Sequence, residues 1–214
     1  IEPIMGEAGV IVPPADYLQQ LRQLCDKNGS LLVIDAVQTG MGRTGDWFGY
    51  EYSGITPDVI TLAKGLGGGL PLGAMIALGK ASELFQPGDH GSTFGGNPLS
   101  CAAGTATLQA LTQDGLIDNA EKMGKMFKNG LEVLKEKHNI IREIRGKGLM
   151  IGIELKYEVR DILMEGIEKN LLLLYSGRNI LRLLPPLVIT EQDVTKSLEI
   201  LDELLTNEER RRNG

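Results

Sequence analysis

Two short apolar runs, Leu31–Ile34 and Val59–Ala63, each end directly before a charged residue. Both runs are rich in β-branched residues and are followed by turn residues, so each is predicted to be a buried strand. Asp35 follows the first run, and Lys64 with the glycine cluster of residues 65–69 follows the second. A full charge at the end of an apolar strand is costly unless it is paired or used. The pattern therefore predicts an α/β sheet with a polar site at one edge.

The chemistry of that edge depends on whether the two strands are neighbours. In open α/β sheets, ligands bind beyond the carboxyl ends of the strands. If the strands are parallel and adjacent, Asp35 and Lys64 face the same crevice. A lysine and an aspartate there suit pyridoxal phosphate, because the lysine forms its Schiff base and the aspartate pairs with the protonated pyridine nitrogen. From these two residues alone, a structural ion pair at the sheet rim is an equally good interpretation.

Six motifs in a fixed order along the chain favour the cofactor. Together they resemble the class III aminotransferases, the pyridoxal-phosphate enzymes of ornithine, acetylornithine and 4-aminobutyrate type, from Ile1 to about Leu205. The motifs are EPIMGEAG (Glu2–Gly9), DAVQTGMGRTG (Asp35–Gly45), PDVITLAKGLGGGLPLGA (Pro57–Ala74), GSTFGGNPLSCAA (Gly91–Ala103), RGKGLMIGIEL (Arg145–Leu155) and LRLLPPLVIT (Leu181–Thr190).

The resemblance implies an α/β, fold-type I transferase, and it implies that the chain is the C-terminal portion of a longer enzyme. Residues 1–115 are expected to form the C-terminal half of the large α/β/α cofactor-binding domain, and residues 116–138 a connecting helix. Residues 139–206 are expected to form a small C-terminal α+β domain, and residues 207–214 a frayed polar tail.

The implied activity moves an amino group to 2-oxoglutarate. The expected donor carries an ω-amine: ornithine, acetylornithine or a related intermediate of lysine or arginine metabolism. Two alternatives stay open. One is another reaction of the same family, of the 4-aminobutyrate aminotransferase or glutamate-1-semialdehyde aminomutase type. The other is a truncated chain that is inactive on its own.

The resemblance also assigns roles to residues around the cofactor. Lys64 carries pyridoxal phosphate as a Schiff base and then acts as general base and acid. Asp35 keeps the pyridine nitrogen protonated. Gln38 lies near the phenolic oxygen of the ring. Thr93, in a glycine-rich loop, reaches the cofactor phosphate of the neighbouring subunit, which implies a homodimer.

Arg182 lies among leucines just before a pair of prolines. An arginine in such surroundings needs an anionic partner, and its planar guanidinium suits a carboxylate. A structural salt bridge is the alternative interpretation, which the family motif makes the less favoured one. The resemblance implies that Arg182 binds a substrate carboxylate, and that Glu7 pairs with Arg182 and swings away when that carboxylate arrives. By itself, Glu7 would be interpreted as a solvated acid in a loop.

The periodicity of apolar residues predicts the remaining elements. Small residues in the helix that begins at Asn97 are expected to let another element pack closely on it. The predicted helices are Pro13–Asn28, Asn97–Leu111, Leu116–Lys137, Val159–Lys169 and Glu191–Leu205, and the predicted strands are Leu70–Leu78, Ile140–Ile144, Met150–Leu155, Leu171–Tyr175 and Ile180–Leu183.

Composition limits the class of protein. The chain has 214 residues, of which 42% are hydrophobic, and a formal net charge of −6. The acidic balance argues against nucleic acid as a partner, and no apolar run reaches the ~18 residues of a membrane-spanning helix. Two histidines lack the spacing of metal ligands. Cys25 and Cys101 are expected to be buried free thiols, typical of a cytoplasmic protein.

Overall fold

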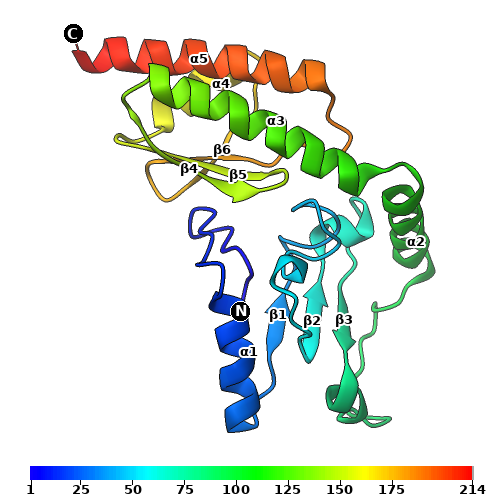
Figure 1. Cartoon of the computed structure of the whole chain (residues 1–214). Coiled ribbons are helices and arrows are strands. Elements are labelled where there is room, and N and C mark those ends of the chain that lie inside the picture. The colour runs from blue at the N-terminus through cyan, green and yellow to red at the C-terminus, as the bar shows by residue number, and fades with distance from the viewer. Residues whose placement is uncertain (214) are drawn as a thin grey trace. The chain divides into compact units, whose positions relative to one another are not determined.

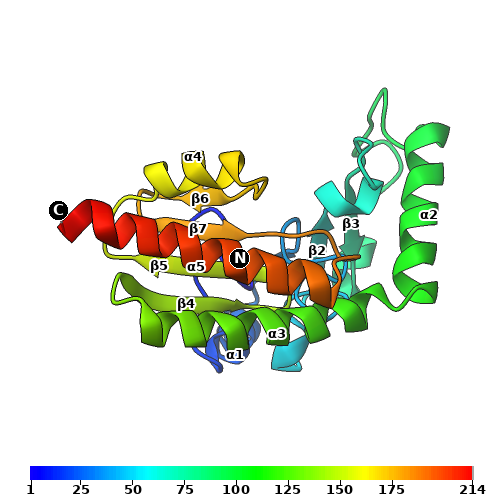
Figure 2. The same ribbon diagram turned by 90° about the horizontal axis from the view of Figure 1, so that it is seen from above.

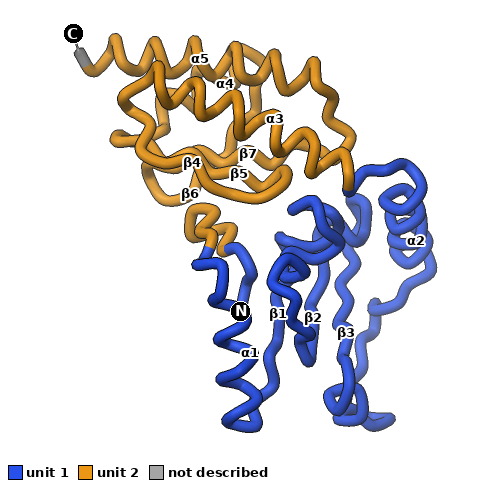
Figure 3. The backbone as a smooth tube through the Cα atoms, viewed as in Figure 1, with its two compact units in different colours: residues 1–4, 13–117 blue, residues 5–12, 118–214 orange. Residues whose placement is uncertain are grey.

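The computed structural model describes residues 1–213, which divide into two compact units (Figure 3). Unit 1 comprises residues 1–4 and 13–117, and unit 2 comprises residues 5–12 together with the chain from Asp118 onward. Two segments thus differ from the expected organisation. The helix expected as a connection belongs almost entirely to unit 2, and so does the short segment 5–12.

Unit 1 contains a three-stranded sheet in the order β1-β2-β3 (Figure 1). β1 (Val33–Asp35) and β2 (Val59–Leu62) are parallel neighbours, and β3 (Ala74–Ala77) pairs with β2 in the antiparallel direction. The strands are shorter than predicted, and Asp35 is the last residue of β1 instead of the first residue after it. Buried side chains such as Ile34, Ile60 and Leu18 form the core around this sheet.

Unit 1 also contains α1 (Tyr17–Asn28), α2 (Pro98–Gln113) and the short 3-10 turns η1 (Glu51–Ser53), η2 (Lys64–Gly67) and η3 (Gly79–Glu83). α1 ends at Asn28 as predicted, with Gly29 as its C-cap, but it begins four residues after Pro13, where the sequence placed its start. The pair of prolines explains why Pro13 itself lies outside the helix, because a residue before proline is pushed out of the helical region. α2 begins as predicted: the N–H of Ser100 donates to the Asn97 side chain at 2.9 Å, and a proline occupies the first turn.

Unit 2 is a four-stranded antiparallel sheet in the order β4-β5-β7-β6. Three helices cover one face (Figures 1 and 2), and segment 5–12 lies on the opposite face (Figure 3). The core lies between the sheet and its helices, and includes Phe127, Leu131, Ile153, Leu181 and Leu201. The elements are α3 (Leu116–Lys137), β4 (Ile141–Lys147), β5 (Met150–Leu155), α4 (Arg160–Glu168), β6 (Leu174–Ser176), β7 (Ile180–Leu183) and α5 (Glu191–Asn213).

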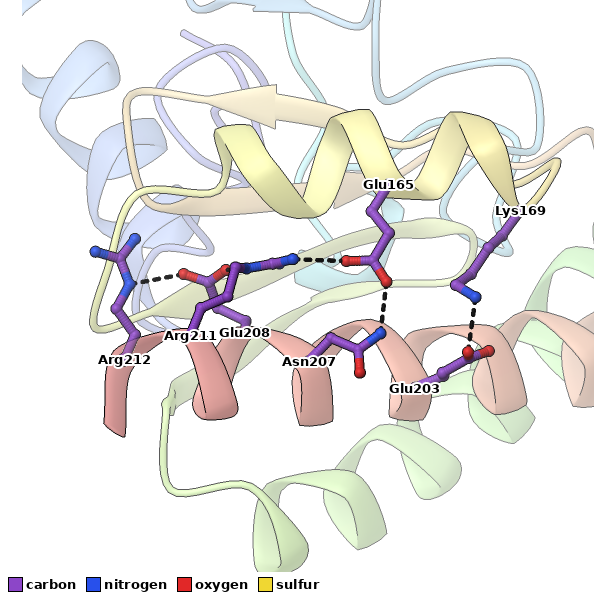
Figure 4. A network of polar contacts seen from close by, with 7 residues as sticks. All are labelled: Glu165, Lys169, Glu203, Asn207, Glu208, Arg211 and Arg212. Atoms are coloured by element: carbon purple, nitrogen blue, oxygen red, sulfur yellow. Dashed lines mark hydrogen bonds and ion pairs between the residues drawn. The ribbon is translucent and has the colours of Figure 1, made fainter. Parts of the chain in front are cut away.

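The expectation of a frayed tail at 207–214 is wrong for the described residues, because α5 continues to Asn213. Figure 4 shows the polar contacts that hold its last turns. Glu208 is 1% exposed, and Arg211 and Arg212 each donate to its carboxylate at 2.8 Å. Glu165 of α4 accepts from Asn207 at 2.6 Å and from Arg211 at 2.9 Å. These contacts neutralise a buried acid and hold the side chains of Arg211 and Arg212 in place. Gly214 lies outside the described residues.

The two cysteines are free, but Cys25 is half-buried and Cys101 is exposed, so the prediction of two buried thiols is wrong. Cys101 lies on the exposed face of α2. The spacing of apolar residues did not distinguish this position from a buried one. Across residues 1–213, every helix is too short or too polar to cross a membrane. The same residues contain no group of three or more side chains suited to hold a metal ion.

Candidate active site

The carboxyl ends of β1 and β2 bring two predicted residues to one edge of the unit 1 sheet. Asp35 is paired in register with Thr61. Lys64 comes three residues after Thr61, just beyond the end of β2. Asp35 is half-buried, and its Oδ1 accepts the N–H of Val37 at 3.0 Å. Gln38, also half-buried, lies in the turn that leaves this edge. The parallel pairing on which the cofactor hypothesis depended is therefore present.

Lys64 has a backbone conformation that its side chain does not favour. Its φ is +47°, in the left-handed region, while the preceding Ala63 is extended. Non-glycine residues there are strained, and such strain clusters at functional positions. The N–H of Leu66 donates to Ala63 at 3.0 Å and holds the turn closed. The chain therefore leaves β2 abruptly at the lysine, which is exposed.

Helix α2 packs directly against the turn that follows Lys64. A Cβ added at Gly104 of α2 would lie 2.5 Å from Cδ2 of Leu72, and one added at Gly68 would lie 2.5 Å from Oγ1 of Thr107. A side chain at either position would require the Leu72 or Thr107 side chain to shift. The prediction that the small residues of α2 allow close packing is confirmed, and the packing fixes the backbone beside the lysine.

Thr93 lies outside the strand edge that carries Asp35 and Lys64. It is exposed in the glycine-rich loop that precedes the N-cap residue Asn97. The structure thus brings together Asp35, Gln38 and Lys64, and places Thr93 on a separate exposed loop. Its predicted role across a subunit interface stays a prediction.

The second predicted pair lies in unit 2. Arg182 is in the middle of β7 and is 6% exposed, while the Glu7 side chain is 75% exposed. Nη1 of Arg182 donates to Oε1 of Glu7 at 2.9 Å. The fold therefore brings together two residues that are 175 positions apart in the chain. Their contact is present, and the gating role assigned to it stays a prediction.

Glu7 lies in a small closed loop, Met5–Ile11, which we call the Glu7 loop. Its two ends are joined by reciprocal backbone hydrogen bonds of 3.0 Å. Two side chains of the unit 2 sheet hold its backbone: the Ser176 hydroxyl donates to the carbonyl of Glu7, and Nε of Arg145 donates to the carbonyl of Gly9 at 2.9 Å. The sequence singled out neither role. Arg145 begins one of the motifs, but an isolated serine such as Ser176 gives no signal.

The donor set at the unit 1 edge fits pyridoxal phosphate. A primary amine at Lys64 can bond the aldehyde carbon, a carboxylate at Asp35 can pair with a protonated pyridine nitrogen, and the amide of Gln38 can reach a ring oxygen. The glycines after the lysine keep bulky side chains away from that edge. An ordinary rim ion pair would need none of this clearance.

Comparisons with known proteins identify the family of the chain. A family model described as aminotransferase class-III matches residues 1–205. A curated acetylornithine aminotransferase from Caldanaerobacter subterraneus is 49% identical over 207 residues, which cover 96% of this chain and 52% of that protein. The chain thus spans about half the length of the curated relatives it matches.

Solved structures give the same result. Ornithine δ-aminotransferase from Plasmodium falciparum is similar with a TM-score of 0.91 at 40% identity, over 96% of this chain and 55% of that one. Ornithine aminotransferase from Toxoplasma gondii gives a TM-score of 0.95 at 34% identity, over 100% of this chain and 51% of that one. In the Toxoplasma protein, PLP partly occupies the active site.

Proposed function

The chain belongs to the class-III aminotransferase family. We propose that it takes part in the transfer of the ω-amino group of acetylornithine or ornithine to 2-oxoglutarate. Its fold is the fold-type I α/β fold of pyridoxal-phosphate aminotransferases. The observation that carries the proposal is the arrival of Asp35 and Lys64 at the same edge of one parallel strand pair. The names of the relatives support the choice of donor over the 4-aminobutyrate and aminomutase alternatives.

The residues of unit 1 supply the acid–base chemistry. Bound pyridoxal phosphate supplies an electron sink next to the amine-bearing carbon of the substrate. With the cofactor bound, Nζ of Lys64 would take the proton from that carbon and would return it to the adjoining carbon of the cofactor. The Asp35 carboxylate would hold a proton on the ring nitrogen, and Gln38 would orient the ring. Thr93 would bind the cofactor phosphate of a second subunit in a homodimer, which we place in the cytoplasm.

The residues of unit 2 select between two kinds of substrate. Arg182 carries a permanent charge, so it attracts any carboxylate that enters the site. With an ω-amine donor, an open Arg182 would bind the α-carboxylate and bring the wrong amine to the ring. Glu7 covers that charge, at 2.9 Å in the structure. When 2-oxoglutarate binds, its carboxylate displaces Glu7, whose side chain is exposed to solvent.

The proposal is tested first at Lys64. Incubation of the enzyme with pyridoxal phosphate, then borohydride reduction and peptide mapping, should label Lys64, since reduction fixes the cofactor to the amine that held it. Lys64→Ala should keep the far-UV circular dichroism spectrum and lose both the label and the activity. Lys80→Ala, at an exposed lysine in η3, is the matched control and should change neither. A label found on another lysine would overturn the assignment.

The gate is tested at Glu7. Glu7→Ala leaves Arg182 uncovered at all times, so glutamate should become a better donor relative to an ω-amine. A screened acid–arginine contact should lower the ratio of kcat/KM for the ω-amine over glutamate by about 10- to 100-fold. The measurement is that ratio in the wild type and in Glu7→Ala. A constant ratio, or one that moves toward the ω-amine, would return Glu7 to the status of an ordinary surface acid.

A further inference from the structure

The backbone of the Glu7 loop is held at two points, at Glu7 itself and two residues after it. The carbonyl of Glu7 accepts from the hydroxyl of Ser176, the last residue of β6, which is 4% exposed. The carbonyl of Gly9 accepts from Nε of Arg145 at 2.9 Å. Both donors belong to the sheet that carries Arg182. The same sheet therefore presents the arginine and holds the backbone of its partner.

Arg145 is itself fixed in place. Its side chain is 9% exposed, and Nη1 donates to Glu143 at 2.7 Å and to Glu154 at 2.8 Å. The hydrogen bond from Arg145 holds the pKa of Glu154 below its usual value, although burial acts in the opposite direction. These two contacts orient the guanidinium so that Nε can donate to the loop, at the carbonyl of Gly9.

Val10 requires the loop to stay in one position on the sheet. It is completely buried, and its φ is +54°, a left-handed conformation that is rare for a β-branched residue. It packs against Gly152, which is paired in register with Arg182: a Cβ added at Gly152 would lie 3.0 Å from that of Val10. A strained residue persists only where its surroundings determine it. The two hydrogen bonds to the loop carbonyls provide that constraint.

We propose that Ser176 and Arg145 are positioning residues for the substrate gate: they hold the Glu7 loop on the sheet so that the Glu7 carboxylate stays over Arg182. The inference rests on the proposed function, since it assumes that the Glu7–Arg182 pair selects the donor. Neither residue needs to touch substrate or cofactor. Each acts on donor selectivity through Glu7, and the proposal therefore predicts that their effect disappears when Glu7 is absent.

The first experiment measures the ratio of kcat/KM for an ω-amine donor over glutamate in the cofactor-loaded enzyme. Ser176→Ala should lower that ratio by about three- to tenfold, the effect of one buried hydrogen bond, and by less than Glu7→Ala. Ser176→Thr, which keeps the hydroxyl on a strand residue, should restore it. The matched control is Ser53→Ala in unit 1, which removes another buried hydroxyl that donates to a backbone carbonyl, at 2.6 Å, and should leave the ratio unchanged.

A double variant separates positioning from a general structural effect. In the Glu7→Ala background, Ser176→Ala should lower the ratio no further, because residues that act through one contact are not additive. An equal fall in both backgrounds would overturn the proposal, and so would a wild-type ratio in Ser176→Ala when Glu7→Ala shifts it. If Glu7→Ala itself shifts nothing, the gate in the proposed function fails, and the next measurement decides the positioning alone.

The second experiment needs no turnover. The amides of Gly9 and Val10 both donate to the carbonyl of Gly6, at 3.3 Å, so their hydrogen exchange reports whether the loop stays in place. Ser176→Ala should speed their exchange about three- to tenfold, with the control Ser53→Ala at the wild-type rate. If Ser176→Ala does not fold, Arg145→Lys keeps a positive charge beside Glu143 and Glu154 while it loses the Nε donor, and the same acceleration is expected. Unchanged exchange in the folded variants would overturn the proposal.

Discussion

Lys64, Val10 and Met41 share a backbone conformation that their side chains disfavour, with φ values of +47°, +54° and +58°. Each such residue costs about 1–3 kcal/mol, which the surrounding packing must offset. Lys64 is the predicted cofactor lysine, and Val10 lies in the Glu7 loop. Met41 packs beside the turn after Lys64, where a Cβ added at Gly65 would lie 3.5 Å from its own. Asn170, which follows α4, also has a positive φ, of +60°, but asparagine tolerates this conformation better than the other three residues do. Lys64 and Val10 therefore carry such strain in segments that are proposed to take part in the reaction.

Asp35 offers a prediction that separates charge from shape. Asp35→Asn keeps the volume of the side chain and the acceptor for the N–H of Val37, but it removes the charge that holds a proton on the ring nitrogen. The half-reaction with the amine donor should slow by about 100-fold or more, the scale seen when one preorganised electrostatic partner is lost. Stopped-flow absorbance of the cofactor measures this rate. Borohydride should still label Lys64, so an almost unchanged rate would mean that Asp35 is only structural.

The sequence identifies site residues when their chemistry conflicts with their surroundings. Lys64, Asp35 and Arg182 stand out because each is a charge beside apolar strand residues. Ser176 does not stand out, since a small hydroxyl residue suits many positions and its partner is a backbone carbonyl 169 residues away. The left-handed conformation of Lys64 could not be predicted either, because glycine is the main sequence signal for such a backbone.

Among the secondary-structure elements, Asp58 joins three segments of unit 1. Its Oδ2 accepts from Nη1 of Arg22 in α1 at 2.6 Å and from the N–H of Leu32, just before β1, at 2.7 Å, and Asp58 itself immediately precedes β2. The Arg22 hydrogen bond, with that from Leu32, holds the pKa of Asp58 below its usual value. The carboxylate therefore stabilises the arrangement that sets the register of the parallel strand pair.

That lowered pKa predicts a dependence of stability on pH. A depressed folded-state pKa stabilises above the unfolded value, and the stabilisation is lost as the pH falls through the folded value. Asp58→Asn should therefore lower the free energy of unfolding of unit 1 by about 1–2 kcal/mol at pH 7, and by much less near pH 3. Urea unfolding followed by fluorescence of Trp47, the single tryptophan, reports on unit 1. An equal loss at both pH values would contradict the assignment.

The control for this prediction is an exposed pair. Glu121 and Lys125 form an i,i+4 ion pair at 2.6 Å on the outer face of α3. Such surface pairs contribute little to stability. Glu121→Gln should leave the urea midpoint almost unchanged at either pH, measured by circular dichroism because α3 lies outside unit 1.

Element boundaries were predictable where local signals act alone. Asn97 and Pro98 define the start of α2, and the predicted bounds of α3, Leu116–Lys137, are those observed. The end of α5 was not predictable, because its last turns depend on contacts with α4 through Glu165 that no local pattern contains. Polar residues at a chain end look frayed in sequence even when one of them, Glu208, is buried.

For the whole molecule, the proposed dimer gives the sharpest test. If Thr93 binds the cofactor phosphate of a second subunit, Thr93→Ala should weaken cofactor retention on dialysis, and retention should fall on dilution below the dimer dissociation constant. Absorbance of the bound cofactor and sedimentation velocity measure the two quantities. Thr105→Ala is the control, since its hydroxyl donates only within α2, to Cys101 at 2.9 Å. A fully active monomer would contradict the role of Thr93.

The large-scale organisation was partly predictable. The division into a large α/β part and a small α+β part follows from the motif order, and the order of helices and strands follows from periodicity. The assignment of segment 5–12 to unit 2 did not follow, because it depends on hydrogen bonds from Arg145 and Ser176 that span more than 130 residues. Sequence patterns report on neighbours along the chain, whereas this segment is held by residues from the far end.

Unit 2 is built from two separate stretches of the sequence, residues 5–12 and the chain from Asp118 onward. The chain passes between the units at residues 4–5, 12–13 and 117–118. A DNA fragment that begins at codon 118 would encode Arg182, Ser176 and Arg145 without the carboxylate and carbonyls that they bind. Such a product would carry a buried guanidinium deprived of its acid and would leave Gly152 uncovered. To express this unit by itself, the octapeptide of residues 5–12 would have to be supplied, either as a separate synthetic peptide or fused through a linker as a circular permutant.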